Sequence, residues 1–259
     1  KPDVIIGAGS FVSVPLVWAG RLFGKKIIIH QQDVRPTLSN KLGAPFASKI
    51  TVSFKKSLED FPKTKTEWIG NPVRDALLAA NPGAAESEFN LEPGAPTVLI
   101  TGGSSGAQGL NQWVWKHLEA LTRAANVVHL AGRGKMDEKK TRARYRQLEF
   151  AGPQMPHLLA AARLVITRGG VSTITELAHL GKASIIIPLP GTHQEDNAFH
   201  CLRERAAVVY RQDQLDETVV RRVRELLASP EKLAELGSAM AALGKRGARE
   251  RMVEIISSV

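Results

Sequence analysis

The chain has 259 residues, of which 43% are hydrophobic, and this content excludes an intrinsically disordered polypeptide. Its longest apolar runs are far shorter than the roughly 20 residues that a membrane-spanning helix needs, so a transmembrane helix is excluded as well. The formal net charge of +10 predicts an anionic partner, and the 5% aromatic content without a nucleic-acid-binding motif argues against nucleic acid and for a lipid surface or a phosphorylated substrate.

Cys201 is the only cysteine, which excludes an intrachain disulfide and fits a reducing cytosol, and we expect it in the core or on a helix face. The spacings HExxH and CxxC are absent, so no metal site is expected. The motif GxSxG is also absent, which argues against an α/β-hydrolase. The chain opens on a strand-like run without a signal peptide, so we expect a fragment or a short homologue.

The first 80 residues alternate strands with helices, the order that predicts a parallel sheet. Apolar runs indicate the strands, and helical periodicity indicates the helices between them. Gly24 stands where a glycine ends a helix. The predicted elements are a strand at 4–6, a helix at 14–22, a strand at 27–30, a helix at 38–46, and strands at 50–53 and 67–69.

A second strand-helix series follows a change of composition. Residues 81–96 read NPGAAESEFNLEPGAP, so we place a domain boundary between Asp75 and Pro96. After it we expect a strand at 97–101, a glycine loop at 102–109, a helix at 110–124, a strand at 127–131, a basic helix at 135–145, a strand at 148–151, a helix at 157–162, a strand at 164–167, a helix at 173–180, strands at 184–188 and 207–210, and helices at 216–227, 230–242 and 248–257.

The stretch from Thr167 to Asn197 is the best candidate for a site. A strand runs into the glycine turn Gly169-Gly170, and after a helix and a second strand comes the polar segment 191–197, which we expect to be a loop. Ligands of open α/β sheets bind outside the carboxyl ends of the strands. Segments 169–176 and 191–197 are therefore predicted to face one crevice.

Several side chains near these turns have both a functional and a structural interpretation. The loop 102–109 can cradle phosphate at a helix N-terminus or be a tight turn, and it lacks the lysine of a P-loop. Arg74 can bind a phosphate with two hydrogen bonds or be a surface residue. Glu176 can accept hydrogen bonds from a ribose or favour the helix dipole, and His30 can be functional or buried in the core.

Six segments taken in order resemble the MurG-type glycosyltransferases, which move N-acetylglucosamine from UDP onto the lipid-linked muramoyl-pentapeptide precursor of peptidoglycan. They are DVIIGAGSFVSVP, IIIHQQD, GNPVR, LITGGSSGAQGLN, TRGGVSTITELAHLGKASIIIPLP and HQEDNA. The resemblance implies an α/β fold of GT-B architecture, with two Rossmann-like domains facing a cleft and the N-terminal one incomplete. It implies an acceptor-side domain at 1–80, a donor-binding domain at 81–245 and a returning helix at 246–259.

The resemblance also implies roles for residues at matching positions. Arg74 and Ser104 would meet the phosphates, Thr173 would lie near phosphate, and Glu176 would bind the ribose. Gln194 would hold the sugar hydroxyls, with His193 in place of another glutamine. The full predicted binding set is Asp33, Arg74, Ser104, Phe150, Ala151, Val171, Ser172, Thr173, Ile174, Thr175, Glu176, His193 and Gln194, where Phe150 and Ala151 belong to the loop that reads the uracil.

The chain departs from the family at several places, including Ser10 and Phe11, where the family has Gly and Tyr. The loop GGTGGH, which carries the proposed general base, is expected before residue 1, which leaves His30 as a weak candidate for the base. The family's HEQN reads His30-Gln31-Gln32-Asp33, so a carboxylate is lost at 31 and one is gained at 33.

We therefore expect an inverting, metal-independent transferase without a cofactor, for which UDP-N-acetylglucosamine is a substrate. The resemblance places it as a peripheral protein at the cytoplasmic face of the membrane, where the lipid-linked acceptor and an anionic membrane surface are its partners. The alternatives are a related lipid glycosyltransferase and a non-catalytic UDP-sugar-binding module.

Overall fold

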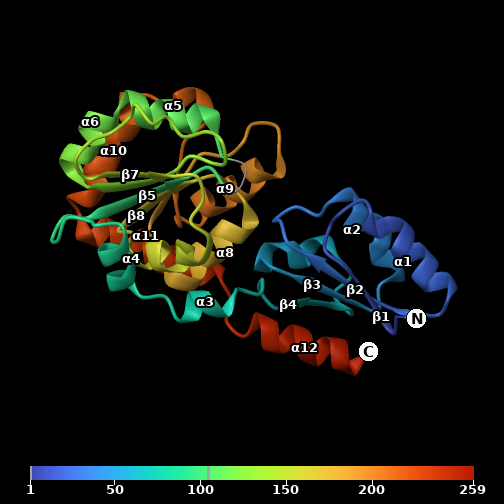
Figure 1. The fold of residues 1–259 in the computed structure, drawn as a ribbon. Coiled ribbons are helices and arrows are strands. Elements are labelled where there is room, and N and C mark those ends of the chain that lie inside the picture. The colour runs from blue at the N-terminus through green and yellow to red at the C-terminus, as the bar shows by residue number, and fades with distance from the viewer. Residues whose placement is uncertain (1, 104–105) are drawn as a thin grey trace. The chain divides into compact units, whose positions relative to one another are not determined.

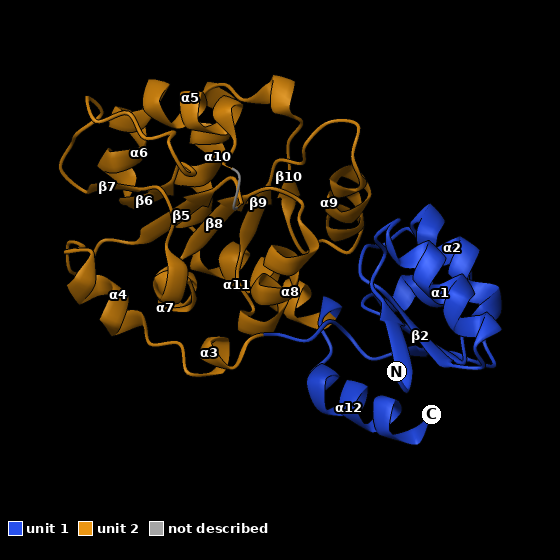
Figure 2. Ribbon diagram, turned by 45° about the vertical axis from the view of Figure 1, so that its right-hand side comes forward, with its two compact units in different colours: residues 1–73, 243–259 blue, residues 74–242 orange. Residues whose placement is uncertain are grey.

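The computed structural model describes residues 2–103 and 106–259. The chain forms two compact units, which are described separately here (Figure 2). Unit 1 comprises residues 1–73 and 243–259, and unit 2 comprises residues 74–242. Each unit is built on a parallel sheet with helices in the connections, so the predicted α/β class is confirmed.

Unit 1 contains a four-stranded parallel sheet with the order β1-β2-β3-β4 (Figure 1). The strands are β1 Val4–Gly7, β2 Lys26–Gln31, β3 Lys49–Val52 and β4 Thr66–Trp68. The helices are α1 Ser13–Leu22, α2 Leu38–Gly43 and α12 Ala248–Ser258, with the 3-10 turns η1 Ala44–Phe46 and η2 Lys55–Asp60.

Alternate residues of β2 supply two separate cores, because successive side chains of a strand point to opposite faces. Ile27 and Ile29 pack with Val17 of α1 on one face. Ile28 packs with Ile69 and with Ile255 of α12 on the other face. The sheet of unit 1 is thus covered on both faces, as parallel sheets usually are.

The C-terminal segment is fastened to the end of β4. Lys245 Nζ donates to the carbonyl oxygen of Trp68 at 2.7 Å and lies 5.0 Å from the centre of its ring. Arg251 donates to both carboxylate oxygens of Glu67, at 2.7 and 2.9 Å, and these bonds hold the pKa of Glu67 below its usual value. Gly70 has φ +83° and passes so close to Lys245 that a Cβ there would lie 2.7 Å from the Lys245 carbonyl oxygen.

Unit 2 contains a six-stranded parallel sheet with the order β10-β9-β8-β5-β6-β7. The strands are β5 Thr97–Thr101, β6 Asn126–Leu130, β7 Tyr145–Leu148, β8 Leu164–Thr167, β9 Ser184–Ile186 and β10 Val208–Val209. The helices are α3 Asp75–Leu78, α4 Pro82–Glu88, α5 Gln108–Lys116, α6 Leu118–Ala124, α7 Met155–Ala161, α8 Val171–Leu180, α9 His193–Arg203, α10 Glu217–Leu227 and α11 Pro230–Leu243, with η3 Gly152–Gln154 and η4 Gln212–Gln214.

The strand order of unit 2 reverses at β5, because the chain continues to β6 on one side and returns to β8 on the other. Helices α5, α6 and α10 lie on one face of the sheet, and α4, α7 and α8 lie on the other (Figure 2). Strands β5, β6 and β8 are buried along their whole length. This reversal is the place where doubly wound sheets bind their ligands.

The predicted basic helix at 135–145 is wrong, because residues 135–144 form turns and irregular backbone between β6 and β7, and Tyr145 begins β7. Asp137 Oδ1 accepts the backbone N–H of Lys139 at 3.1 Å, a local turn that competes with helix formation. The side chains of the segment instead reach separate acceptors, as Arg144 does with Glu92. The predicted strand 148–151 is displaced toward the N-terminus, since β7 spans Tyr145–Leu148.

Two further predictions are corrected. The helix expected at 110–124 is two helices, α5 and α6, because the backbone leaves helical geometry at His117. The polar loop expected at 191–197 is largely the first turn of α9, since the Thr192 hydroxyl accepts the backbone N–H of Gln194 at 3.3 Å. Thr192 followed three residues later by Glu195 is a helix-start signal that the sequence already carried.

Candidate functional site

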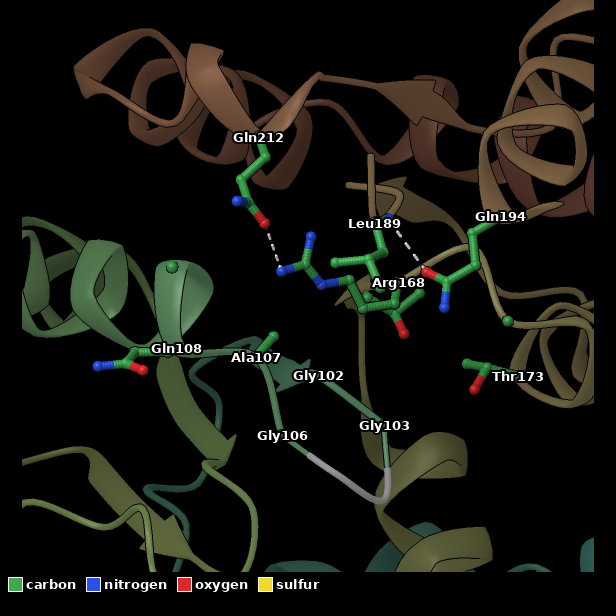
Figure 3. Close-up of a pocket in the computed structure, with 13 residues that line it drawn as sticks. Gly102, Gly103, Gly106, Ala107, Gln108, Arg168, Thr173, Leu189, Gln194 and Gln212 are labelled. Carbon is green, nitrogen blue, oxygen red and sulfur yellow. Dashed lines mark hydrogen bonds between the residues drawn. The ribbon is translucent and has the colours of Figure 1, made fainter. Parts of the chain in front are cut away.

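Unit 2 has a cavity of about 460 Å³ at the reversal of its sheet, above the carboxyl ends of β5 and β8 (Figure 3). It combines the loop after β5, the turn after β8 and the start of α9, so the crevice predicted from segments 169–176 and 191–197 is confirmed. The described residues that line it are Gly102, Gly103, Gly106, Ala107, Gln108, Gly109, Thr167, Arg168, Gly170, Thr173, Leu189, Gln194 and Gln212.

The loop after β5 requires glycine because it folds tightly against its neighbours. A Cβ on Gly106, which has φ +66°, would collide with the carbonyl oxygen of Ala131. The backbone N–H of Gly103 donates to Thr101 Oγ1 at 3.2 Å, which ties the loop to the end of β5. The predicted phosphate contact Ser104 lies outside the described residues.

Two helices begin at this cavity without a side-chain cap. Ala107 precedes α5 and Gly170 precedes α8, and neither supplies a capping oxygen. The first backbone N–H groups of a helix have no partner within the helix, and they carry partial positive charge. Both helix starts are therefore suited to an anionic group in the cavity.

The turn after β8 is held against the start of α9. Asn197 Nδ2 donates to the carbonyl oxygen of Gly169 at 3.0 Å. A Cβ on Gly169 would collide with the carbonyl oxygen of Gln194, so only glycine fits there. Gln194 Oε1 accepts the N–H of Leu189 at 3.1 Å, and its amide nitrogen has no partner among the described residues. That nitrogen is available to donate to a ligand.

Two residues predicted to bind the donor are paired with each other here. Arg74 NH2 donates to Glu176 Oε1 at 2.6 Å. The Arg74 side chain is 59% exposed and that of Glu176 is 13% exposed. A donor that used both side chains would therefore have to replace this ion pair with its own contacts.

His30 lies in unit 1 and is bound on both ring nitrogens. Its Nδ1 is 2.9 Å from Thr51 Oγ1, and its Nε2 is 3.1 Å from Asn71 Oδ1 and 3.3 Å from Ser53 Oγ. Burial lowers the pKa of His30 below its ordinary value. A buried ring in this network is a weak proton acceptor, and its contacts favour the structural interpretation.

The remaining predicted residues fall into different environments. In the first turns of α8, Thr173 lines the cavity, whereas Ile174 is fully buried and the Thr175 hydroxyl donates to Val171 O. Of the others, Val171 and Asp33 are half-buried, Ser172 and His193 are exposed, Ala151 is buried, and Phe150 is exposed with the Arg133 guanidinium 5.8 Å from its ring centre.

The sequence interpretation did not single out four residues that line the cavity: Thr167, Arg168, Leu189 and Gln212. Thr167 and Arg168 immediately precede the double glycine, and this position in the sequence could have indicated that they line the site. Gln212 comes from η4, which follows the edge strand β10, and no local signal indicates it. Its link to the site is the bond from Arg168 NH2 to Gln212 Oε1 at 2.7 Å, which spans 44 positions of sequence.

Comparison with known proteins gives consistent results. The model of the glycosyltransferase family 28 C-terminal domain matches residues 97–252, and that of the family's N-terminal domain matches residues 1–52. The UDP-N-acetylglucosamine–N-acetylmuramyl-(pentapeptide) pyrophosphoryl-undecaprenol N-acetylglucosamine transferase of Thermodesulfovibrio yellowstonii is 34% identical over 100% of this chain and 74% of that protein. An enzyme of the same name from Bacillus cereus, numbered 2, has the same identity and coverage.

Solved structures agree on the fold. The MurG of Acinetobacter baumannii matches with a TM-score of 0.82 and 24% identity, over 99% of this chain and 74% of that one. A UDP-GlcNAc 2-epimerase from Neisseria meningitidis, solved with UDP-GlcNAc bound, matches with a TM-score of 0.74 and 14% identity, over 100% of this chain and 77% of that one. The predicted GT-B fold class is confirmed by these likenesses.

Proposed function

The chain belongs to glycosyltransferase family 28, among the MurG-type transferases, and from this premise we infer that it moves N-acetylglucosamine from UDP-N-acetylglucosamine to lipid I and so forms lipid II for peptidoglycan. It is a hexosyltransferase. The observation that carries this inference within the molecule is the cavity at the reversal of the unit 2 sheet. Its glycine loop and two uncapped helix starts suit a nucleoside diphosphate.

We propose that the donor binds with its diphosphate beside Gly103 and the start of α5. Thr173 and Gln194 line the same cavity, where Gln194 has a free amide nitrogen for a sugar hydroxyl. Once the ion pair between Arg74 and Glu176 opens, Glu176 would accept hydrogen bonds from the ribose hydroxyls and Arg74 would approach a phosphate. The uracil would meet the backbone near Ala151.

The proposed reaction is a single displacement that inverts the anomeric carbon. The acceptor hydroxyl oxygen forms a bond to that carbon, the bond from the carbon to the UDP oxygen breaks, and UDP departs with the electron pair. Backbone N–H groups at the cavity would stabilise the charge that develops on the diphosphate. We propose that no resident metal or cofactor takes part.

The hydroxyl proton passes to a general base, which we do not assign to this cavity. The described residues that line it include no carboxylate and no imidazole. Donor binding is therefore the part of the reaction that we assign to these residues. We propose that the base comes from another part of the protein.

Calorimetric titration with UDP-N-acetylglucosamine tests the assignment. The Glu176→Ala variant should bind UDP more weakly by about 1 to 3 kcal/mol, the range for losing hydrogen bonds to a charged group. An unchanged affinity would remove Glu176 from the site. Turnover with a lipid I analogue then distinguishes a transferase from a binding module, and a diacylglycerol acceptor tests the alternative lipid substrate.

We further propose that unit 1 associates with an anionic membrane surface. No helix of the described residues is long and apolar enough to cross a membrane. Around helix α1, however, large apolar side chains are exposed, of which Phe11, Leu22 and Phe23 are each more than three-quarters exposed. Arg21 and Lys26 lie in the same segment, and residues 4–32 contain no acidic residue. Apolar side chains beside basic ones suit the interface of anionic lipid.

Sedimentation with vesicles tests this surface. The chain should pellet with phosphatidylglycerol vesicles, less so at high salt, and not with neutral phosphatidylcholine vesicles. Replacing Leu22 and Phe23 with Gln should abolish pelleting, whereas Val253→Gln, which changes an exposed apolar residue of α12, should not. Equal pelleting of both variants would contradict the proposal.

A further inference from the structure

Strand β8 ends at the cavity with a buried hydroxyl that has no hydrogen-bond partner among the described residues. Thr167 is 1% exposed and lines the cavity, and its Oγ1 is unpaired. Among the described residues, the other buried side-chain atoms without a partner are His117 Nε2 and Ser184 Oγ, and neither residue lines the cavity. Buried polar atoms are almost always paired, so this hydroxyl calls for a ligand or another explanation.

The register of the sheet shows which way the Thr167 side chain faces. Thr167 pairs with Thr101 of the neighbouring strand β5, and register partners present their side chains on the same face. Thr101 Oγ1 accepts the N–H of Gly103, at the base of the glycine loop. The Thr167 hydroxyl therefore lies on the same face of the sheet as the Thr101 side chain, at the strand end where the glycine loop begins.

The next residue, Arg168, places a cation beside this hydroxyl. Arg168 is 7% exposed, and its NH1 donates to the carbonyl oxygens of Ile187 and Pro188, at 3.0 and 3.3 Å. Its NH2 donates to Gln212 Oε1 at 2.7 Å (Figure 3). These acceptors are all neutral, and no carboxylate of the described residues forms an ion pair with Arg168. A guanidinium has five N–H donors, and these three bonds leave two of them.

Arg168 differs in this respect from Arg74. The Arg74 guanidinium is mostly exposed and is already neutralised by Glu176 at 2.6 Å. A buried cation without a counter-ion is unfavourable, and it becomes favourable when an anion arrives. Arg168 is also the only charged residue among the described residues that line the cavity.

We propose that Thr167 and Arg168 form an anion subsite on the floor of the cavity, which binds a non-bridging oxygen of the donor's diphosphate. The Thr167 hydroxyl donates one hydrogen bond to this oxygen, and the free N–H groups of Arg168 donate charge-assisted ones. The subsite rests on the proposed function, because it takes the diphosphate from the UDP-sugar. Arg168 keeps its three protein bonds and so holds the guanidinium in place for the incoming charge.

The variant Thr167→Val tests the hydroxyl at almost constant shape. Because Oγ1 has no partner in residues 2–103 and 106–259, the substitution should leave the melting temperature unchanged or raise it. Calorimetry should show about tenfold weaker binding of UDP and of UDP-N-acetylglucosamine, with unchanged binding of uridine, which has no phosphate. The matched control is Ser184→Ala, which removes another unpaired buried hydroxyl, at the start of β9 away from the cavity, and it should change no affinity.

The variant Arg168→Lys tests the guanidinium, since lysine keeps the charge but not the planar fork. It should raise KM for UDP-N-acetylglucosamine at least tenfold, and the ratio of UDP to uridine affinity should fall. A Thr167→Val variant that binds UDP as tightly as the wild type would overturn the subsite. An equal loss of UDP and uridine binding would overturn it as well, because that pattern indicates a general distortion.

Titration with inorganic pyrophosphate separates this inference from the proposed function. A wild-type chain that binds pyrophosphate but not UDP would contradict the proposed function, and the effect of Thr167→Val on pyrophosphate affinity would still decide the subsite. A wild-type chain that binds neither would overturn both.

Discussion

The two units differ in how polar groups are hydrogen-bonded at the carboxyl edges of their sheets, although in both units a strand is followed by a glycine turn and a helix. At the carboxyl edge of the unit 1 sheet, polar groups are bonded to one another within the protein. At the corresponding edge of unit 2, polar groups line a cavity, and several of them have no partner within the part of the chain that the structure describes. The comparison indicates that a ligand site is found where a fold leaves hydrogen-bonding capacity unused, rather than wherever a glycine turn occurs.

At the carboxyl edge of the unit 1 sheet, the Gln31 side chain is hydrogen-bonded within the protein at both its nitrogen and its oxygen. Its Nε2 donates to the carbonyl oxygens of Asp33 and Arg35, both at 2.8 Å, and its Oε1 accepts from Asn40 Nδ2 at 2.7 Å and from the Thr37 N–H at 3.4 Å. The Thr37 hydroxyl caps α2. The loop after β1 is bonded in the same way, since Ser39 Oγ donates to the carbonyl oxygen of Gly9 at 2.6 Å.

At the carboxyl edge of the unit 2 sheet, several polar groups have no comparable hydrogen-bond partner among the described residues. Helices α5 and α8 begin without a side-chain cap, and the Thr167 hydroxyl is unpaired. Arg168 is bonded only to neutral acceptors among the described residues. All of these groups are donors, which explains why this edge suits an anion.

The variant Gln31→Glu should have the largest effect on stability. It would break the hydrogen bonds that Gln31 makes at the carboxyl edge of the unit 1 sheet. A carboxylate cannot donate to the two carbonyl oxygens, and it would place a buried charge against them. We expect the free energy of unfolding to fall by about 3 kcal/mol. The control is Gln32→Glu, the same charge change at the adjacent half-buried position. Urea unfolding that finds the two variants equally stable would contradict this account of the unit 1 edge.

Adding a methyl group at Gly169 should have the next largest effect. In Gly169→Ala the new Cβ collides with the Gln194 carbonyl oxygen, so the start of α9 has to move. We expect a loss of about 2 kcal/mol in stability, as for other overpacked sites, together with weaker UDP binding. Gly170→Ala is the neighbouring control, because its Cβ meets nothing within 4 Å and its φ of −69° suits alanine. Similar melting temperatures for both variants would refute the close packing at Gly169.

Acid should have the smallest of the three effects, through buried histidines in both units. Burial lowers the pKa of His129 to about 4, from an ordinary value of 6.5, and lowers that of His30 as well. Between pH 6.5 and 4 the unfolded chain binds more protons than the folded one, so stability falls as the pH falls. For His129 alone the loss between pH 7 and 5.5 is about 1 kcal/mol.

The pH dependence can be measured by chemical unfolding at each pH. His129 Nδ1 is 2.8 Å from Tyr145 Oη, and its Nε2 is 3.0 Å from Asn111 Oδ1. The variant His129→Gln should be less stable at pH 7 but should depend less on pH. A wild-type stability that stays constant from pH 7 to 5.5 would show that these histidines are not neutral and buried.

The strands and the place of the cavity were predictable from sequence, because buried parallel strands are continuous apolar runs and glycine turns mark their ends. The basic segment 135–145 was misassigned because helical periodicity took no account of the turn that the Asp137 side chain makes with the Lys139 N–H. Partners distant in sequence were not predictable. The bond from Arg74 to Glu176 spans 102 positions, and the role of Gln212 depends on β10 lying at the sheet edge. Only the folded chain shows which polar groups are left unpaired.

Hydrogen exchange with and without UDP-N-acetylglucosamine observes both sheet edges in one experiment and so tests whether the donor binds at unit 2 alone. We expect slower amide exchange in segments 106–111 and 168–176 of unit 2 when the donor is present, and unchanged exchange in segments 7–10 and 31–40 of unit 1. Protection confined to the unit 1 segments, or no protection at saturating donor, would contradict this expectation.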